Sequence, residues 1–337
     1  MRFLSDNTAS VSPEILAALA AVNHGRVHSY GDDEWTARLD RAFSDYFGTE
    51  VRAFVVTTGT AANALALAVL SPPYGAIFAH EEAHLETDEC GAPGFFTGGA
   101  QLALLPGEHG RIAPATFAAA LAAHPTHLHS VQAAVLSLSQ ATELGTAYRP
   151  DAIAELAATA HGRGLKVHMD GARFANVVAF LGCHPGDISW RAGVDVLSFG
   201  ATKNGAMGAE AVVFFRPELV RDFERNRKRS AHLHSKSRYV AAQLLAYLEA
   251  DLWRRNAQRA NGFAQRIARA AGVALLHPVE ANEVFVRLGA ERRQRLRAGG
   301  FEFYDWGPAS CGEARLVVSW DQPEEDVHAL CEALTRL

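Results

Sequence analysis

The stretch at residues 165–208 constrains the fold of this chain more than any other; it reads LKVHMDGARFANVVAFLGCHPGDISWRAGVDVLSFGATKNGAMG. It holds two short apolar runs, each followed at once by reactive polar residues. Residues 166–169 predict a buried strand ending at Asp170, and residues 195–199 predict a second strand that leads into a Gly-flanked turn with Lys203. In an open α/β sheet, the carboxyl ends of strands face the crevice in which ligands bind. We therefore expect this acid and this lysine to face one ligand site.

The lysine and the aspartate together indicate a cofactor. A lysine that forms a Schiff base, with an aspartate against a pyridinium nitrogen, is how proteins hold pyridoxal 5'-phosphate (PLP). The chain has only four lysines, which makes the assignment testable by elimination. Lys166 begins a strand, whereas Lys228 and Lys236 lie within a basic run. Lys203 is the one that follows a buried strand in a turn.

Composition excludes several classes of protein. The chain has 337 residues, 49% of them hydrophobic and 20% charged, as in an ordinary soluble enzyme. A net charge of -5 argues against a general nucleic-acid or membrane binder. No apolar run approaches the roughly 18 residues that span a bilayer, and an N-terminus that is polar by its fifth residue is not expected to be a signal peptide. The four scattered cysteines argue against disulfides and favour a reducing cytoplasm.

Two further strand ends carry polar residues. Residues 51–57 predict a strand that flows into Thr58, Gly59 and Thr60 and then into an Ala/Leu helix. Such a turn is a plain connection or a phosphate cradle built from helix N–H groups, and the presence of Lys203 favours the cradle. His84 follows another short strand, at residues 76–79. Its imidazole can stack on an aromatic cofactor or relay protons, although a lone histidine is more often structural.

Other polar stretches have structural interpretations. Asp32 and Asp33 are predicted to form a turn and cap the next helix. The histidine-rich HPTHLH run has no nearby acid or cysteine, so no metal site is expected there. The basic segment at residues 217–238 is a solvated helix face, a phosphate contact or a subunit interface. Arg315 lies in the β-rich run RLVVSW, where an arginine snorkels or clamps a carboxylate.

The C-terminal part predicts a second, smaller domain. A long helical stretch at residues 239–271 leads into short strands that alternate with helices, at residues 273–276, 284–286, 301–304 and 315–319. This alternation is typical of a small α+β domain. We therefore expect an N-terminal arm and large cofactor-binding domain at residues 1–245 and a small domain at residues 246–337.

Taken in order, these motifs resemble those of the PLP-dependent L-threonine aldolases of fold type I, within the β-eliminating lyase group. The resemblance runs from LSDN through YGDDEWT, TTGTAAN and EEAH to HMDGARFAN, SFGATKNG and ARLVVSW, and so covers nearly the whole chain. It is closest to bacterial low-specificity and phenylserine-type aldolases, which share SQATELGT and SFGATKNG. The implied fold is α/β, with a mostly parallel sheet flanked by helices in the large domain.

The resemblance implies roles for the strand-end residues. Lys203 matches the lysine that holds PLP covalently, and Asp170 matches the acid on the pyridine nitrogen. Gly59 and Thr60 match the phosphate cradle. His84 matches the histidine stacked on the ring.

The resemblance also implies a substrate-binding site, and it implies that neighbouring subunits share their active sites. Arg173, Ser5 and Arg315 match the groups that hold the substrate carboxylate, with Arg173 also beside the cofactor. Tyr30 and Lys228 match residues that reach into the neighbouring subunit's site, in the substrate and cofactor regions respectively. Family members are dimers or, more often, tetramers built from dimers, so a homotetramer is expected.

The expected reaction is reversible cleavage of L-threonine, L-allo-threonine or another L-β-hydroxy-α-amino acid, phenylserine included, to glycine and an aldehyde. Many family members have ENTHNG where this chain has SQATEL, and the position of a histidine proposed to contact the substrate hydroxyl aligns with Thr142. His84, directly or through a water, is left as the candidate base. The alternatives are another PLP reaction, namely β-elimination, transamination or racemisation, and a non-catalytic PLP-binding homologue.

Overall fold

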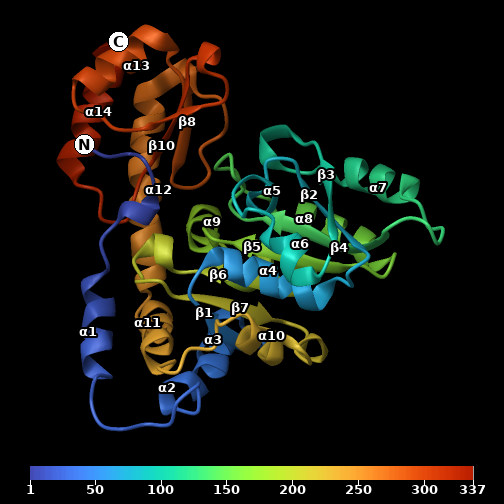
Figure 1. Cartoon of the computed structure of the whole chain (residues 1–337). Helices are drawn as coiled ribbons and strands as arrows, with labels where there is room; N and C mark the ends of the chain where they lie inside the picture. The colour runs from blue at the N-terminus through green and yellow to red at the C-terminus, as the bar shows by residue number, and fades with distance from the viewer. Residues whose placement is uncertain (337) are drawn as a thin grey trace.

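A seven-stranded sheet lies at the centre of the computed structural model, which describes residues 1–336, without the side chains of Val273 and Ala309 (Figure 1). Its strand order is β1-β7-β6-β5-β4-β2-β3. The strands are β1 (Arg52–Val56), β2 (Gly75–His80), β3 (Gln101–Leu105), β4 (Gln132–Ser139), β5 (Lys166–Gly171), β6 (Val196–Gly200) and β7 (Glu210–Phe214). Neighbouring strands from β3 to β6 pair in parallel, whereas β7 is antiparallel to both β6 and β1. The predicted mostly parallel α/β sheet is confirmed.

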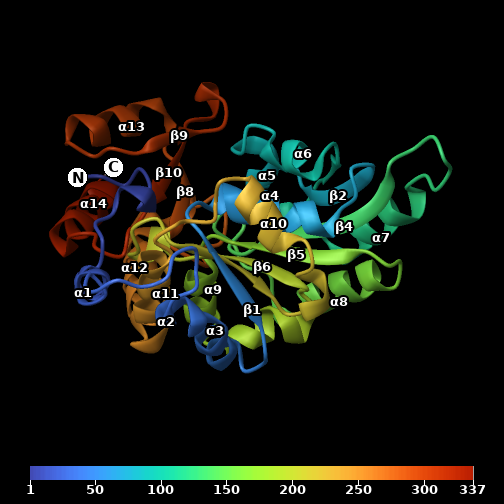
Figure 2. The ribbon, with the colours of Figure 1, turned by 60° about the horizontal axis from the view of Figure 1, so that its bottom comes forward.

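Helices cover both faces of this sheet, as Figure 2 shows. One face carries α4 (Gly59–Leu70), with α6 (Ala92–Thr97) and α10 (Phe223–Arg229) beside it. The other carries α3 (Leu39–Phe47), α8 (Pro150–His161), α9 (Phe174–Leu181) and α11 (Arg238–Glu249). Strands buried on both sides favour apolar residues, and β6 and β7, which are buried at every position, are apolar except for Ser198 and Glu210. The remaining helices of this part are α1 (Pro13–Ala21), α2 (Glu34–Ala37), α5 (His84–Thr87) and α7 (Pro114–Ala123).

The carboxyl ends of the parallel strands meet at one edge of the sheet. Because β7 runs in the opposite direction, its first residue, Glu210, lies at this same edge. The segments that leave or enter the sheet here follow β1, β2, β4, β5 and β6 and precede β7. Residues that are far apart in the sequence are therefore brought together where a ligand can reach them.

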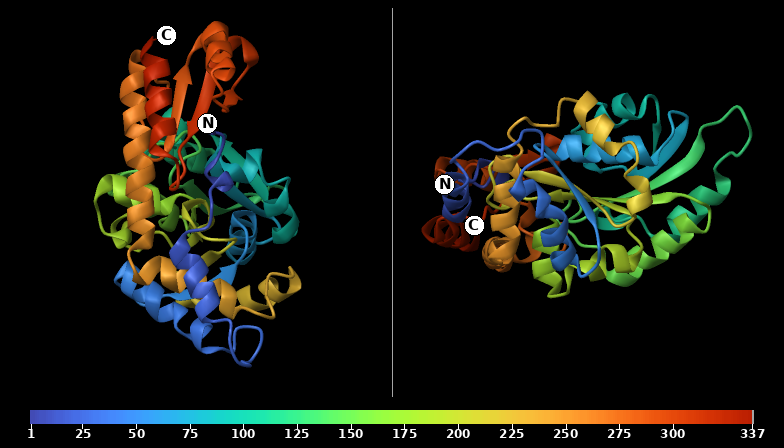
Figure 3. Two further views of the ribbon diagram at one scale, coloured as in Figure 1. Left: turned by 90° about the vertical axis from the view of Figure 1, so that its left-hand side faces the viewer. Right: turned by 90° about the horizontal axis from the view of Figure 1, so that it is seen from below.

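The C-terminal part has its own sheet and core. Strands β8 (Glu283–Arg287), β10 (Glu313–Val317) and β9 (Tyr304–Trp306) form an antiparallel sheet in that order. The C-terminal part also contains helices α13 (Gly289–Ala298) and α14 (Glu324–Arg336). Helix α12 (Leu252–Ala271) runs from the large part into the small one (Figure 3). Its buried side chains pack in the large core near Leu252 and in the small core near Ile267.

We propose a division into two domains near α12. The expected boundary after residue 245 falls within α11, whose side chains pack in the large core. The N-terminal arm contacts both parts: the Phe3 N–H donates to the carbonyl of Glu302 in the small part, and the Ser12 N–H donates to the carbonyl of Gly205 in the large part, each at 2.8 Å.

Three sequence expectations differ from the structure. The expected helical stretch at 239–271 is two helices, interrupted where Asp251 adopts a left-handed φ of 53°. The expected strand at residues 273–276 is wrong, since Gly272–Ala274 is a 3₁₀ helix and only Leu275 bridges to Val286. The expected strand at residues 301–304 begins only at Tyr304. By contrast, Asp33 caps α2 as predicted, accepting from the backbone N–H of Thr36 at 2.8 Å.

Candidate active site

A cavity of about 250 Å³ opens at the carboxyl edge of the large sheet. Five of the residues singled out in the sequence line it: Gly59, Thr60, His84, Asp170 and Lys203. They come from the segments after β1, β2, β5 and β6. The sheet topology explains why these residues lie close together, because the carboxyl ends of these strands lie at the same edge of the sheet.

Lys203 lies in a one-turn 3₁₀ helix, Thr202–Asn204, directly after β6. The next residue fixes this turn: the Asn204 side chain donates to the Tyr247 hydroxyl at 2.6 Å and to the Trp253 carbonyl at 2.8 Å. Within residues 1–336, the Lys203 amine forms no hydrogen bond or ion pair. A half-buried, unpartnered amine that faces a cavity is available for a covalent bond to a carbonyl compound.

Asp170 is held at the end of β5 by two hydrogen bonds. Its carboxylate accepts from the Asn63 side chain at 2.7 Å and from the Ala172 N–H at 3.0 Å. Asn63 lies on α4 and also donates to Glu89 at 2.8 Å. The orientation of Asp170 is therefore fixed by residues from a different element.

His84 is joined to this network through Glu89. Its Nδ1 lies 2.9 Å from the Glu89 carboxylate, which fixes the imidazole ring and leaves Nε2 as its free nitrogen. The hydrogen bond to Glu89 raises the pKa of His84. Burial raises the pKa of the Glu89 carboxyl. The result is a chain of hydrogen bonds from His84 through Glu89 and Asn63 to Asp170.

The start of α4 forms one wall of the cavity. The Thr58 hydroxyl caps this helix by accepting from the Ala61 N–H at 3.2 Å. A Cβ built on Gly59 would meet no atom within 4 Å, so the backbone is open to the cavity here. The first N–H groups of a helix lack carbonyl partners, and the helix dipole favours an anion beside them. The start of α4 can therefore accommodate an anion, as the predicted phosphate cradle requires.

The predicted carboxylate-binding residues Arg173, Arg315 and Ser5 are not among the residues that line the cavity. The buried Arg173 donates from Nε and Nη2 to Asp6 at 2.7 and 3.0 Å, and its Nη1 lies 3.3 Å from Glu283. Burial acts to raise the pKa of Asp6, but Arg173 and Lys203 hold that pKa below its usual value. A substrate carboxylate that binds Arg173 would therefore have to compete with acids of the protein itself.

Arg315 and Ser5 have other contacts. The Arg315 guanidinium lies 5.5 Å from the ring centres of both Tyr304 and Trp306, and its Nε is buried without a hydrogen-bond partner in the described part of the chain. The Ser5 hydroxyl accepts from the Asn7 N–H at 3.1 Å. An unpartnered guanidinium nitrogen leaves Arg315 able to bind an additional acceptor.

Tyr30 and Lys228 lie together on the surface, and neither lines the cavity of its own chain. The Lys228 ammonium is 4.5 Å from the centre of the Tyr30 ring. Tyr30 is 49% exposed and has a left-handed φ of 61°. The contact shows that two residues about 200 positions apart in the sequence form one surface feature.

Sequence reasoning missed several polar residues of the site, among them Asn63, Glu89, Glu143 and Glu210. An asparagine in the otherwise apolar α4 was the available signal for Asn63. Thr142, which aligned with a substrate-contacting histidine, does not line the cavity; its buried hydroxyl lies 2.9 Å from that of Thr146. The neighbouring Glu143 lines the cavity instead.

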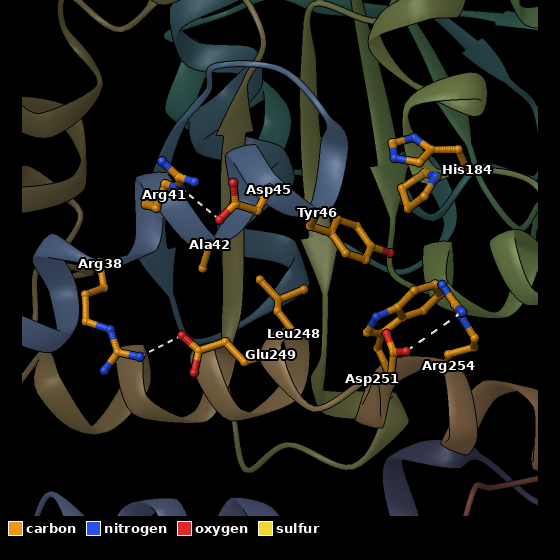
Figure 4. A pocket seen from close by; sticks show the side chains of 12 residues that line it. Arg38, Arg41, Ala42, Asp45, Tyr46, His184, Leu248, Glu249, Asp251 and Arg254 are labelled. Carbon is orange, nitrogen blue, oxygen red and sulfur yellow. Dashed lines mark hydrogen bonds and ion pairs between the residues drawn. The ribbon is translucent and has the colours of Figure 1, made fainter.

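A second cavity, of about 490 Å³, lies between α3 and the region that joins α11 to α12 (Figure 4). Tyr46 lies across its centre, and ion pairs stand on either side. Arg38 pairs with Glu249 at 2.7 Å, Arg41 with Asp45 at 2.8 Å, and Arg254 with Asp251 at 3.8 Å. Its charged groups are thus already neutralised by one another, which distinguishes it from the cavity with the free lysine.

Together these features fit a PLP site. The unpartnered lysine amine, the fixed aspartate and the open helix start occupy one sheet edge, as the cofactor's carbonyl, ring nitrogen and phosphate require. The α/β architecture and these groups define a fold type I PLP-dependent enzyme. Across residues 1–336, no group of three or more histidine, cysteine, aspartate or glutamate side chains is arranged to hold a metal ion.

Comparison with known proteins assigns the family. The chain belongs to the β-eliminating lyase family, whose model matches residues 2–291. It is 45% identical to the low specificity L-threonine aldolase of Pseudomonas aeruginosa and 42% identical to that of a Pseudomonas species, with 98% of this chain and 95% of each relative covered. The solved structure of Leishmania major threonine aldolase matches with a TM-score of 0.93 at 25% identity, over 99% of this chain and 98% of that one. None of the helices in residues 1–336 combines the length and apolar character that crossing a membrane requires.

Proposed function

We propose that this protein catalyses the PLP-dependent, reversible cleavage of L-threonine, L-allo-threonine and related L-β-hydroxy-α-amino acids to glycine and an aldehyde. The observation that carries the proposal is the free Lys203 amine beside Asp170, in a chain 45% identical to a low specificity L-threonine aldolase. PLP, when bound, supplies an electron-accepting ring system that stabilises negative charge on Cα. Lys203 would hold it covalently, and Asp170 would keep its ring nitrogen protonated.

The remaining site residues have complementary roles in this proposal. The first turn of α4, at Gly59 and Thr60, would bind the phosphate. His84 would stack on the ring. Arg173 and Arg315, with Ser5 close by, would hold the substrate carboxylate in a fixed orientation, because a guanidinium binds a carboxylate through two parallel hydrogen bonds. The fixed orientation of the substrate carboxylate determines which bond at Cα is broken.

A product assay tests the proposed reaction. Enzyme is mixed separately with L-threonine, L-allo-threonine, phenylserine, serine, and glycine plus aldehyde, and the products are identified. We expect glycine and the matching aldehyde from the β-hydroxy amino acids, and the reverse reaction from glycine. Ammonia and a keto acid without free glycine would contradict the proposal and favour β-elimination.

Replacing Gly59 with alanine is expected to weaken cofactor binding without loss of stability. The added methyl group meets open space in the protein, and alanine favours a helix over glycine by about 1 kcal/mol. The same methyl group would occupy the position of the phosphate. Titration of PLP into apoprotein, followed by visible absorption, should show a Kd raised about tenfold or more, a loss of about 1.4 kcal/mol. An unchanged Kd would place the phosphate elsewhere.

We further propose that the protein is a cytoplasmic homotetramer built from dimers with shared active sites. The support is the exposed pair of Tyr30 and Lys228, which does not line the cavity of its own chain. In such a dimer, Lys203→Ala and Lys228→Ala subunits would complement each other. Each mixed dimer should regain one of its two sites, and because about half of the dimers in an equal mixture are mixed, the mixture should regain about a quarter of the wild-type sites. Absence of any regained activity after refolding the two variants together would contradict shared sites.

A further inference from the structure

The aldol cleavage proposed above needs a group that accepts the proton of the substrate's β-hydroxyl. As the Cα–Cβ bond breaks, the O–H electron pair forms the carbonyl of the aldehyde, and the Cα–Cβ electron pair remains on Cα. Cα then gains a proton, and the base releases the one that it took, so that the products are glycine and aldehyde. A positioned side chain that performs this transfer must lie in the cavity and have a free acceptor atom.

Most acidic and basic groups of the cavity are already engaged. Asp170 accepts hydrogen bonds from Asn63 and Ala172. The Glu210 carboxylate accepts from the Ala201 N–H at 3.1 Å. The His84 imidazole is tied through Nδ1 to the Glu89 carboxylate at 2.9 Å. Glu143 differs: within residues 1–336, its carboxylate has no hydrogen-bond or ion-pair partner.

The turn that carries Glu143 is held rigidly. The Thr142 N–H donates to the Thr146 carbonyl at 2.9 Å, and the Gly145 N–H donates to the Thr142 carbonyl at 2.9 Å. The Thr146 hydroxyl donates to the His109 carbonyl at 2.6 Å. These bonds fix the backbone on both sides of Glu143 while its side chain remains free in the cavity. Thr142 thus belongs to a turn that is fixed by hydrogen bonds.

From this arrangement we propose that Glu143 is the catalytic base that takes the proton of the substrate's β-hydroxyl. The inference rests on the proposed aldolase function. The sequence left His84 as the candidate base for the β-hydroxyl proton. The proposal assigns this proton transfer to the Glu143 carboxylate instead. The role follows from position and from the absence of any competing partner for the carboxylate.

The electrostatic surroundings of Glu143 suit this role. Burial, helped by the charge of Asp170, raises the pKa of Glu143 to about 7. A base with a pKa near the working pH combines a useful deprotonated fraction with a strong affinity for the proton. The charged and titratable groups that act on it are Asp170, Lys203, Arg173, Glu283 and His84.

The test compares holoenzyme of wild type, Glu143→Gln and the control Glu82→Gln, which changes an exposed glutamate outside the cavity. Three quantities are measured: kcat for L-allo-threonine cleavage, exchange of the α-proton of glycine in D₂O, and visible absorption of bound PLP. Glycine lacks the hydroxyl, so its exchange needs the cofactor and carboxylate sites but not the proposed base. For Glu143→Gln we expect a fall in kcat of about 10²–10⁴-fold, with exchange and absorption within about twofold of wild type. Glu82→Gln should resemble wild type in all three.

The pH dependence gives a second readout. Glu143 must be deprotonated to act, so kcat of wild type should rise as the pH increases through about 7 and then level off. Glu143→Gln should lose this rise. Cleavage by Glu143→Gln near the wild-type rate would overturn the inference, as would an equal loss of cleavage and glycine exchange. Selective loss of cleavage in His84→Asn alone would assign the base to His84. A wild type that exchanges glycine but releases no aldehyde would refute the proposed function instead.

Discussion

Replacing Lys203 with alanine is expected to abolish the covalent attachment of PLP and to reduce the cleavage rate by on the order of 10⁴-fold or more, because the variant loses both its nucleophile and a proton carrier. The physical basis is the amine itself, which faces the cavity without a partner in residues 1–336. Visible absorption, before and after borohydride reduction, measures the attachment directly.

The control for this variant is Lys236→Ala, which changes an exposed lysine of the basic segment. It should retain the absorption and the cleavage rate of wild type. If Lys203→Ala still shows the visible band, and borohydride removes that band while leaving the pyridoxyl group attached to the denatured protein, the covalent bond is to one of the three remaining lysines. A peptide map of the reduced protein would then identify which.

Replacing Arg173 with glutamine is expected to lower both stability and substrate binding. Asp6 and Glu283, each 1% exposed, would lose their common positive partner. Breaking a buried pair in this way leaves uncompensated charge and costs about 3–5 kcal/mol in the free energy of unfolding. Urea unfolding of the apoprotein measures this loss, and KM for the amino acid should rise in protein that remains folded.

A surface arginine provides the matched control. Arg191 pairs with Asp187 at 2.8 Å, but both side chains are more than a third exposed. Arg191→Gln should change the free energy of unfolding by less than about 1 kcal/mol, because solvent screens exposed pairs. If Arg173→Gln were no more destabilising than Arg191→Gln, Arg173 would not be the charge that compensates the two buried acids. An unchanged KM would remove Arg173 from the carboxylate site.

The sequence was sufficient to predict that Lys203, Asp170 and Gly59 lie together at one edge of the sheet. Lys203, Asp170 and Gly59 each stand directly after an apolar run that buries itself as a strand. Where strands are parallel, their carboxyl ends share an edge, so adjacency in space follows from a local pattern. The strands that carry these residues formed as predicted, and all three residues line one cavity.

Only the tertiary structure identified the groups that hold these residues in place. Arg173 meets Asp6 across 167 positions of sequence, and Asn282 donates to the same acid across 276. Asn63 reaches Asp170 from a helix that packs over the sheet. Such contacts depend on how whole elements pack, and no local spacing encodes them. The same holds for Glu143: the sequence places it beyond β4, but only the folded chain shows that its neighbour Thr142 is tied into the turn while Glu143 faces the cavity without a partner in the described residues.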